Sequence, residues 1–210
     1  MTNQSEQVDF WRGEFGDGYM ERNNPDAATI RTRIAMWSQI LSRLVGRPPK
    51  SILEVGANIG LNLRALSHLT DAELWGIEPN DRALAKLVED KVVDKDNALA
   101  GTGADLKLPD GSVEMAFTSG VLIHIHPDDL LENCKQMHRV SSRYIVCIEY
   151  FADQPVELKY RDHANKLFKR DFGGYWMDNF PDLQLVDYGF AWKRVTQLDN
   201  LTWWIFEKRA

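Results

Sequence analysis

The regular alternation of short apolar strands with helices between residues 51 and 150 constrains the fold of this chain more than any other feature. Strands are predicted at 51–55, 72–77, 98–103, 113–119 and 143–150. Helices are predicted between them at 60–69, 81–91 and 127–139. Strands that alternate with helices at this spacing pair in parallel, because each helix returns the chain across the sheet before the next strand begins. The pattern therefore predicts an α/β fold built on a doubly wound, mostly parallel sheet.

The two ends of the chain depart from this alternation. Residues 26–45 predict an amphipathic helix, since apolar side chains recur there at every third or fourth position. Residues 183–193 and 201–208 are two strand-like runs separated by a polar turn, so the sheet is expected to end in an antiparallel hairpin.

The length is that of one domain, because a single hydrophobic core organises chains of up to about 250 residues, and this chain has 210. Within that domain we expect an N-terminal helical lid and first helix at 1–50, a core at 51–150, an insertion at 151–182 and a terminal hairpin at 183–210.

Composition restricts the partners and the compartment. The formal net charge of −6 gives no overall attraction to nucleic acid or to an anionic membrane, so neither is expected as a partner. Two cysteines are too few for a disulfide scaffold, and the N-terminus lacks the basic start and apolar run of a signal peptide. We therefore expect a cytoplasmic protein, either a monomer or a homodimer.

The strongest local motif is EVGANIG at residues 54–60, where the first strand ends and the first helix begins. Gly56 and Gly60 allow a sharp turn and a close approach of the backbone to a ligand, and the helix that follows presents free amide groups. Asn58 stands where a second glycine is usual, but asparagine tolerates the left-handed backbone of such a turn. Taken alone, the glycine pair also fits an ordinary turn between a strand and a helix that binds no ligand.

Polar residues follow three further strands. Glu78 ends the second strand about twenty residues after the glycine turn, where a carboxylate can accept both hydroxyls of a ribose. Asp105, after the third strand, can accept from an adenine amine or cap a turn. Ser119 and His124 follow the fourth strand. Because the carboxyl ends of parallel strands meet at one edge of the sheet, the sequence predicts one ligand crevice there.

Together these segments make the chain resemble the class I S-adenosylmethionine-dependent methyltransferases, whose fold is Rossmann-like. The resemblance rests on the segments EVGANIG, GIEPN, GADLKLPDGS, TSGVLIHI and LTWWIFEK. It implies an enzyme that uses S-adenosyl-L-methionine as its cofactor. The N-terminal string WRGEFGDGYMERN further resembles the methylases associated with pseudaminic acid biosynthesis. That resemblance implies methyl transfer to an oxygen or nitrogen atom of a small sugar-related or other anionic metabolite.

The resemblance also implies which residues hold the cofactor. Glu78 would hold the ribose, Asp105 would lie by the adenine, and Tyr19 and Arg22 would close over the site. The implied set is Tyr19, Arg22, Glu54, Gly56, Ala57, Asn58, Gly60, Asn62, Glu78, Pro79, Ala104, Asp105, Leu106, Ser119, Gly120 and Val121.

An amine or hydroxyl acceptor must lose a proton, so a nearby base is expected. His124 is the first catalytic candidate, because it directly follows a strand, and His163 in the insertion is the second. His124 also fits a capping role, and it forms a His-x-His pair with His126, but no third ligand is evident and we expect no metal.

The insertion is rich in aromatic and basic side chains, which suit an anionic acceptor but also suit a solvated charged helix. The candidate substrate-binding residues are Trp11, Tyr150, Tyr160, Arg161, Lys169 and Trp176.

Two other functions share part of this pattern. A nicotinamide-dependent (NAD) oxidoreductase has the same turn and acidic strand end, but a dinucleotide turn carries glycine at the position of Asn58 and glycine or alanine at that of Leu61. A catalytically silent S-adenosylmethionine-binding module on the same fold is the non-enzymatic alternative.

Overall fold

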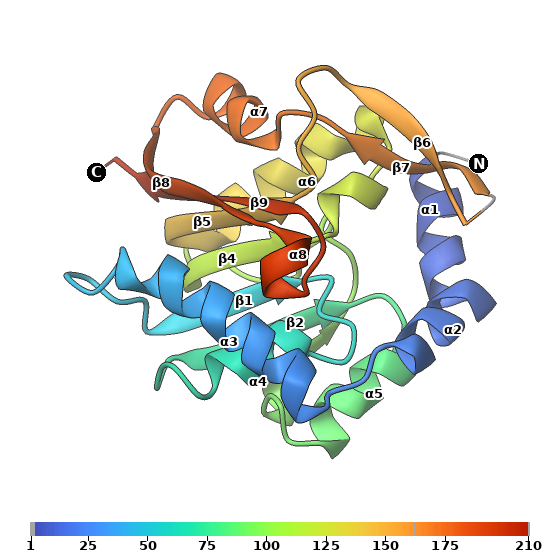
Figure 1. Cartoon of the computed structure of the whole chain (residues 1–210), viewed down its shortest axis with the longest axis horizontal. Coiled ribbons are helices and arrows are strands. Elements are labelled where there is room, and N and C mark those ends of the chain that lie inside the picture. The colour runs from blue at the N-terminus through green and yellow to red at the C-terminus, as the bar shows by residue number, and fades with distance from the viewer. Residues whose placement is uncertain (1–2, 162, 210) are drawn as a thin grey trace.

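The computed structural model describes residues 3–161 and 163–209, in which a seven-stranded sheet carries helices on both faces (Figure 1). The strands are β1 (Ser51–Val55), β2 (Glu73–Glu78), β3 (Ala98–Ala100), β4 (Val113–Ser119), β5 (Ser141–Glu149), β6 (Val156–Tyr160), β7 (His163–Lys169), β8 (Leu183–Ala191) and β9 (Leu201–Lys208). The α-helices are α1 (Asn3–Arg12), α2 (Glu14–Arg22), α3 (Ala27–Ser42), α4 (Leu61–Leu66), α5 (Asp81–Glu89), α6 (Pro127–Val140), α7 (Phe172–Asn179) and α8 (Lys193–Thr196). Two 3-10 turns, η1 (Lys95–Asn97) and η2 (Leu122–His124), complete the described elements.

The strand order of the main sheet is β3-β2-β1-β4-β5-β9-β8. The first five strands are parallel, and β9 lies antiparallel between β5 and β8. The prediction of a doubly wound, mostly parallel sheet that ends in an antiparallel hairpin is confirmed. The chain leaves β1 toward β2 on one side and enters β4 on the other, which makes the carboxyl end of β1 the switch point where such sheets bind ligands.

Burial follows the position of each strand in the sheet. Six consecutive residues of β5, from Tyr144 to Glu149, are buried, because helices cover both faces of a central parallel strand. The edge strand β8 instead alternates between covered and exposed side chains. Its outward face is therefore available to solvent.

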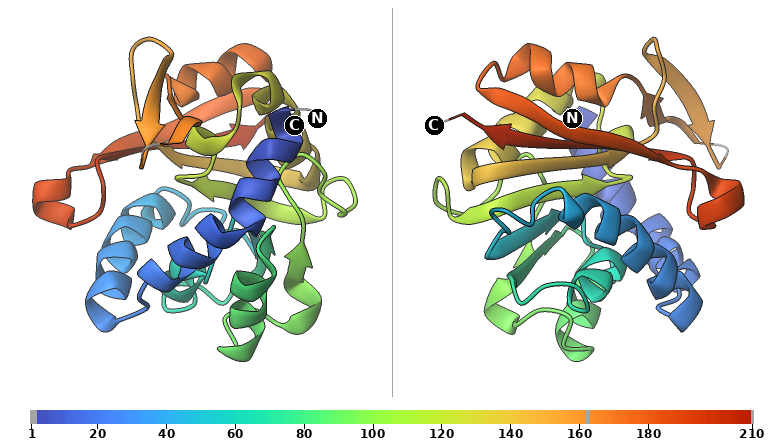
Figure 2. Two further views of the ribbon diagram at one scale, coloured as in Figure 1. Left: turned by 90° about the vertical axis from the view of Figure 1, so that its right-hand side faces the viewer. Right: turned by 60° about the vertical axis from the view of Figure 1, so that its left-hand side comes forward.

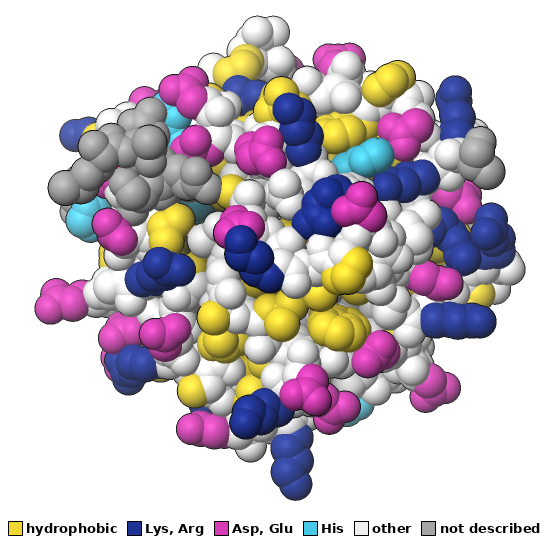
Figure 3. Space-filling model, turned by 180° about the vertical axis from the view of Figure 1, so that it is seen from behind, with side chains coloured by type: hydrophobic (Ala, Val, Ile, Leu, Met, Phe, Trp, Pro, Cys, Tyr) yellow, Lys and Arg dark blue, Asp and Glu magenta, His cyan; other side chains and the backbone are white. Residues whose placement is uncertain are grey.

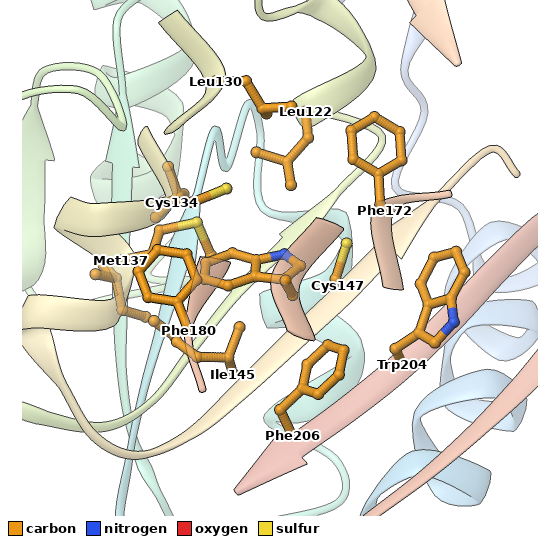
Figure 4. Close-up of a cluster of buried hydrophobic side chains, with 14 of the residues drawn as sticks. Leu122, Leu130, Cys134, Met137, Ile145, Cys147, Phe172, Phe180, Trp204 and Phe206 are labelled. Carbon is orange, nitrogen blue, oxygen red and sulfur yellow. The ribbon is translucent and has the colours of Figure 1, made fainter. Parts of the chain in front are cut away.

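Helices α3, α4 and α5 cover one face of the sheet and α6 and α7 cover the other (Figure 2). On the first face, Trp37 of α3 is fully buried, and its ring centre lies 4.7 Å from that of Phe117 in β4. On the second face, side chains of α6 and α7 meet those of β5 and β9, with Cys134 and Cys147 as free buried thiols (Figure 4).

The N-terminal residues form two short helices, as the predicted helical lid requires. Gly13 separates α1 from α2. Gly16 allows a close packing of the two, because a Cβ there would lie 1.8 Å from the carbonyl oxygen of Trp11. The first long helix, predicted at 26–45, is α3, and Asp26 is its N-cap, accepting from the amide of Thr29 at 2.7 Å.

The insertion at 151–182 folds as the β6–β7 hairpin followed by α7. The expectation that Trp176 binds substrate is wrong. Its side chain is fully buried on α7, 5.0 Å between ring centres from Phe180, because the apolar side of this helix packs onto the sheet. The end of the chain also differs in detail, since the connection between β8 and β9 contains the short helix α8 as well as the polar turn.

In the part of the chain that the structure describes, no helix is both long and apolar enough to cross a lipid bilayer.

Replacing Gly173 with alanine is expected to lower the free energy of unfolding by about 1–3 kcal/mol, because the added Cβ would lie 2.3 Å from Nε1 of the buried Trp204. Urea denaturation measures the difference. Gly46→Ala is the matched control, since nothing lies within 4 Å of its Cβ position, and its effect should stay within about 0.5 kcal/mol. Equal stability of the two variants would contradict the close packing of α7 against Trp204.

Candidate functional site

A cavity of about 180 Å³ opens at the carboxyl ends of β1, β2 and β4; we call it the donor cavity. Its lining includes eleven of the residues that the resemblance implied, and these are Tyr19, Glu54, Gly56, Ala57, Asn58, Asn62, Glu78, Pro79, Ser119, Gly120 and Val121. The remaining lining residues are Gln7, Val8, Trp11, Asn23, Arg33, Val55, Leu61, Thr102, Gly103, His124 and Ile125.

The glycine turn has the left-handed geometry that its sequence predicts. Gly56 has φ +77°, and Asn58 has φ +48°. The side-chain oxygen of Asn58 accepts from the amide of Ile59 at 2.8 Å, which compensates for the missing glycine. Gly60 also has a positive φ of +72°, but it does not line the donor cavity. A Cβ there would lie 2.6 Å from Leu87, so this glycine permits close packing of α5 rather than contact with a ligand.

Glu78 lies at the end of β2 with its carboxylate held by backbone amides. Its two oxygens accept from the amides of Asn58 at 2.7 Å and Asn80 at 2.9 Å. Burial raises the pKa of Glu78 to about 7, and the two amides oppose that rise. The side chain is thus a fixed acceptor on the wall of the donor cavity.

Glu54, near the end of β1, is the second buried carboxyl group of the cavity. Its Oε1 accepts from Asn62 at 2.7 Å, and Asn62 in turn accepts from the indole of Trp37 at 3.2 Å. Its Oε2 is buried and has no hydrogen-bond partner among the described residues. Burial raises the pKa of Glu54 to about 8, opposed by the Asn62 hydrogen bond and by the charge of Arg33.

Arg33 of α3 is the cation of the donor cavity, and the sequence reasoning missed it. Burial lowers its pKa, and the nearby charge of Glu54 opposes that change. A signal was present in the sequence, because Arg33 lies three residues after Ile30 and four before Trp37, on the apolar side of its helix. Arg22, which was expected to approach the cofactor, lies over the rings of Phe15 and Tyr19 and does not line the cavity.

The segment after β3 departs most from expectation. Asp105 is exposed and pairs with Lys107 at 2.6 Å, and Leu106 belongs to the hydrophobic core. Neither residue lines the donor cavity, and Ala104 does not line it either. Thr102 and Gly103 line it instead, because the chain turns away from the sheet edge after Gly103. Ala104, Asp105 and Leu106 thus lie outside the donor cavity as it stands, and their contact with an adenine stays a prediction.

The loop after β4 is held from below by Glu149, the last residue of β5. One carboxylate oxygen accepts from the amides of Val121 at 3.1 Å and Leu122 at 3.0 Å, and the other accepts from Ile123 at 3.4 Å. Glu149 is completely buried, so these amides satisfy a group that water does not reach. The positions of Gly120 and Val121 on the cavity wall depend on this carboxylate.

His124 ends the 3-10 turn η2 and lines the donor cavity with 9% of its surface exposed. Its Nδ1 lies 2.6 Å from the carbonyl oxygen of Lys166. Because a carbonyl only accepts, Nδ1 carries the proton and Nε2 keeps its lone pair. Burial lowers the pKa of His124 to about 4, so the ring is neutral near pH 7. His126 accepts from the amide of Asp128 as the N-cap of α6.

The lid covers the donor cavity with aromatic side chains. Trp11 lies 4.8 Å from His124 and 5.4 Å from Tyr19 between ring centres. His163, the second catalytic candidate, does not line the cavity; it is exposed and packs on Phe10 and Phe15 of the lid. The position of His163 does not favour a catalytic role, because its exposed ring lies outside the donor cavity.

Three of the expected substrate residues, Tyr150, Tyr160 and Lys169, line a second cavity beside the first. Arg161 is exposed at the tip of the hairpin and lines neither cavity. No group of three histidine, cysteine or acidic side chains with metal-site geometry occurs among the described residues.

Residues 53–146 match the model of a methyltransferase domain. A comparison with curated proteins finds no significant match. Among solved structures, the chain is similar to the 1,6-didemethyltoxoflavin-N1-methyltransferase of Burkholderia thailandensis, with a TM-score of 0.73, 17% identity and coverage of 100% of this chain and 92% of that one. It is also similar to the magnesium protoporphyrin IX methyltransferase of Synechocystis, with a TM-score of 0.66, 12% identity and coverage of 100% and 98%.

The cyclase SpnF has the same fold as well, with a TM-score of 0.64, 10% identity and coverage of 90% of this chain and 86% of that one. The fold of the chain is thus that of class I methyltransferases. The match over residues 53–146, together with this fold, supports an enzyme that transfers methyl groups.

Replacing Glu149 with glutamine is expected to make stability less dependent on pH. Burial raises the pKa of Glu149 from 4.5 to about 7, so the folded chain holds a proton that the unfolded chain releases between these values. This group therefore stabilises the fold most below pH 4.5, and its contribution falls by about 2 kcal/mol between pH 5 and pH 7.

Urea denaturation at pH 5 and pH 7 tests this expectation. The wild type should lose about 2 kcal/mol more than Glu149→Gln over that interval. The exposed Glu89→Gln serves as the control and should follow the wild type. Parallel pH dependences of all three proteins would show that Glu149 does not take up a proton on folding.

Proposed function

We propose that this chain transfers the methyl group of S-adenosyl-L-methionine to an oxygen or nitrogen atom of a small anionic, sugar-related metabolite. The observation that carries the proposal is the donor cavity, which gathers a left-handed glycine turn, two buried carboxyl groups and one cation at the switch point of the sheet. The methyl donor is S-adenosylmethionine, as for the methyltransferase domain that residues 53–146 match.

The residues present fit this donor. The buried Oε2 of Glu54 has no partner among the described residues and is available to the donor's ammonium group. Arg33 supplies a cation for the carboxylate of the donor's methionine part, and Glu78 supplies fixed acceptors for the donor's ribose hydroxyls. A Cβ added at Gly120 would meet nothing within 4 Å, which leaves room beside the cavity. The chemistry that the donor supplies when bound is an electrophilic methyl group on a positively charged sulfur.

The chain's own residues position the acceptor, exclude water and accept a proton. Holding the acceptor atom in line with the methyl group contributes several kcal/mol to catalysis without a further chemical group. The lid residues Trp11 and Tyr19 cover the cavity with aromatic surface. His124 offers the lone pair of Nε2 as the general base, since Nδ1 is already committed to the carbonyl of Lys166.

The lid must shift when the donor binds. The cavity of about 180 Å³ is smaller than the roughly 300–1,000 Å³ of small-molecule sites. Helix α1 contributes Gln7, Val8 and Trp11 to its lining, so an outward movement of α1 enlarges it. The string that resembles the pseudaminic acid methylases forms this lid, which supports a sugar-related acceptor as part of the proposal.

One face of the molecule lacks the charge pattern that favours nucleic acid as the acceptor. On the face seen in Figure 3, basic and acidic side chains are interspersed. Nucleic-acid surfaces instead concentrate basic side chains along one face. The NAD-dependent alternative is disfavoured by the glycine turn, where Asn58 occupies the position of the second dinucleotide glycine.

Calorimetry is expected to detect binding of S-adenosylhomocysteine, and Glu78→Ala should weaken it at least about tenfold. The reason is the loss of hydrogen bonds to a charged group, worth about 1.5–3 kcal/mol each. The exposed Glu89→Ala is the control and should bind as the wild type does. Absence of binding, together with clear binding of a nicotinamide dinucleotide, would favour the oxidoreductase instead.

Replacing His124 with asparagine is expected to lower turnover by about 10²–10⁴ while the affinity for S-adenosylhomocysteine changes little. The measurement is transfer of labelled methyl to an acceptor that the wild type methylates. Because the pKa of His124 is lowered to about 4, wild-type kcat/KM should fall only as the pH approaches that value, and this limb should disappear in the variant.

His163→Asn is the comparison for this test. Loss of turnover in His163→Asn with full activity in His124→Asn would reverse the assignment of the base. Full activity in both variants would mean that the enzyme acts by positioning alone. A silent binding module would bind S-adenosylhomocysteine and transfer no methyl group to any acceptor.

A further inference from the structure

A second cavity of about 830 Å³ lies between the β6–β7 hairpin and the strands β8 and β9. In Figure 1 the hairpin and α8 lie at the same end of the β8–β9 pair. We call this cavity the aromatic groove, and the residues that define it are Tyr150, Tyr160, Lys169, Tyr188, Phe190 and Trp204. Its volume falls within the roughly 300–1,000 Å³ of small-molecule sites.

The floor of the groove is a strip of aromatic rings on one face of the sheet. Tyr188 and Phe190 alternate along β8 and are 64% and 58% exposed. Trp204 is the register partner of Tyr188 on β9, so it points to the same face, where its ring is buried and lies at the base of the groove. Phe151, 47% exposed, continues it at 6.5 Å from Trp204 between ring centres. Flat rings that remain exposed together provide a surface on which another ring can stack.

The charges of the groove leave one cation uncompensated. Lys193 pairs with Asp199 at 2.9 Å, and the neighbouring Lys193 and Tyr150 side chains lower the pKa of Asp199 against the effect of burial. Lys169 forms no ion pair with any residue that the structure describes. Its ammonium group lies 4.7 Å from the ring centre of Tyr150 and faces the groove. The groove therefore favours a ligand with one negative charge beside its ring.

Tyr160 separates the groove from the donor cavity. Its ring lies 4.7 Å from that of His124 and 6.4 Å from that of Trp11, and both of those residues line the donor cavity. The same ring lines the groove. A ligand in the groove thus reaches the candidate base across the thickness of one side chain.

We propose that the aromatic groove holds the methyl acceptor, and that the acceptor is a small ring-bearing molecule with one anionic group that pairs with Lys169. This inference rests on the proposed function, because it takes the neighbouring cavity as the donor site. The ring stacks on Tyr188 and Phe190, and the atom to be methylated points past Tyr160 toward His124. Transfer requires the Tyr160 side chain to turn aside, so that the acceptor atom meets the methyl group in line and the methyl group leaves the donor sulfur as the new bond forms.

The first experiment uses 8-anilino-1-naphthalenesulfonate, an aromatic anion whose fluorescence rises in apolar sites, and its uncharged counterpart N-phenyl-1-naphthylamine. Lys169→Met should weaken binding of the sulfonate about threefold to tenfold and leave binding of the uncharged dye unchanged. Lys159→Met is the matched control, since it removes the same charge from an exposed position of the same hairpin outside the groove. Tyr188→Ala should weaken binding of both dyes.

Saturating S-adenosylhomocysteine should not displace the sulfonate, because the two ligands occupy different cavities. Displacement, equal affinities of Lys169→Met and Lys159→Met, or no binding would each overturn the proposed site. Dye binding that follows these expectations in a chain that does not bind S-adenosylhomocysteine would support the groove and contradict the proposed function. Failure of the proposed groove and failure of the proposed function therefore give different results.

The second experiment tests the role as acceptor site. The chain is incubated with methyl-labelled S-adenosylmethionine and a protein-free mixture of small cell metabolites, and the products are separated by anion exchange. The labelled product should be retained as an anion, and Lys169→Met should lose most of it while Lys159→Met keeps it. A neutral or cationic labelled product, or no labelled product from a chain that binds S-adenosylhomocysteine, would overturn the acceptor assignment.

The exposed strip could instead be covered by a second copy of the chain. Light scattering of the wild type and of Tyr188→Ser decides this point, and the same molar mass is expected for both. A dimeric wild type that becomes monomeric in Tyr188→Ser would identify the strip as a protein interface and overturn the small-molecule groove.

Discussion

The site depends on three glutamates that are buried at the carboxyl ends of their strands. Glu54, Glu78 and Glu149 lie at or near the ends of β1, β2 and β5. Each loses its hydration on folding, which raises all three pKa values, and each regains hydrogen bonds from the loop or helix beside it. The glycine turn is held by the bonds to Glu78 and the loop after β4 by the bonds to Glu149, so the cavity walls depend on buried carboxyl groups whose hydrogen bonds offset part of their lost hydration.

The second feature that organises the site is the meeting of the two ends of the sequence over this edge. Lys166 of the hairpin is 5% exposed and pairs with Glu6 of the lid at 2.9 Å. Trp11, His124 and Tyr160 come from the lid, the core and the hairpin, and their rings pack together. A movement of the lid therefore changes the packing around the candidate base, His124, and around Tyr160, which separates the two cavities. In the proposed reaction, these contacts connect the donor cavity to the acceptor site.

The fold alone does not decide the chemistry, since methyltransferases and a cyclase have structures similar to this one. The side chains at the strand ends carry the functional argument. Here a fixed carboxyl group, a half-buried arginine and a neutral histidine line one cavity, and an aromatic groove with an uncompensated lysine adjoins it. A polar cavity beside an aromatic groove provides separate places for the two ligands of the proposed methyl transfer.

The sequence by itself determined the order of strands and helices along the chain, the left-handed turn at Asn58 and the place of Glu78, because strand and helix periodicity and glycine geometry are local properties. Tertiary structure alone decided which loop side chains face the cavity. Arg33 lines the donor cavity from a helix whose sequence pattern predicts a core helix, whereas Asp105 is exposed to solvent and Trp176 is buried in the core. The physical reason is that a loop or helix side chain is oriented by the surfaces packed against it. For Trp11, His124 and Tyr160 those surfaces come from segments more than thirty residues apart, which no local pattern records.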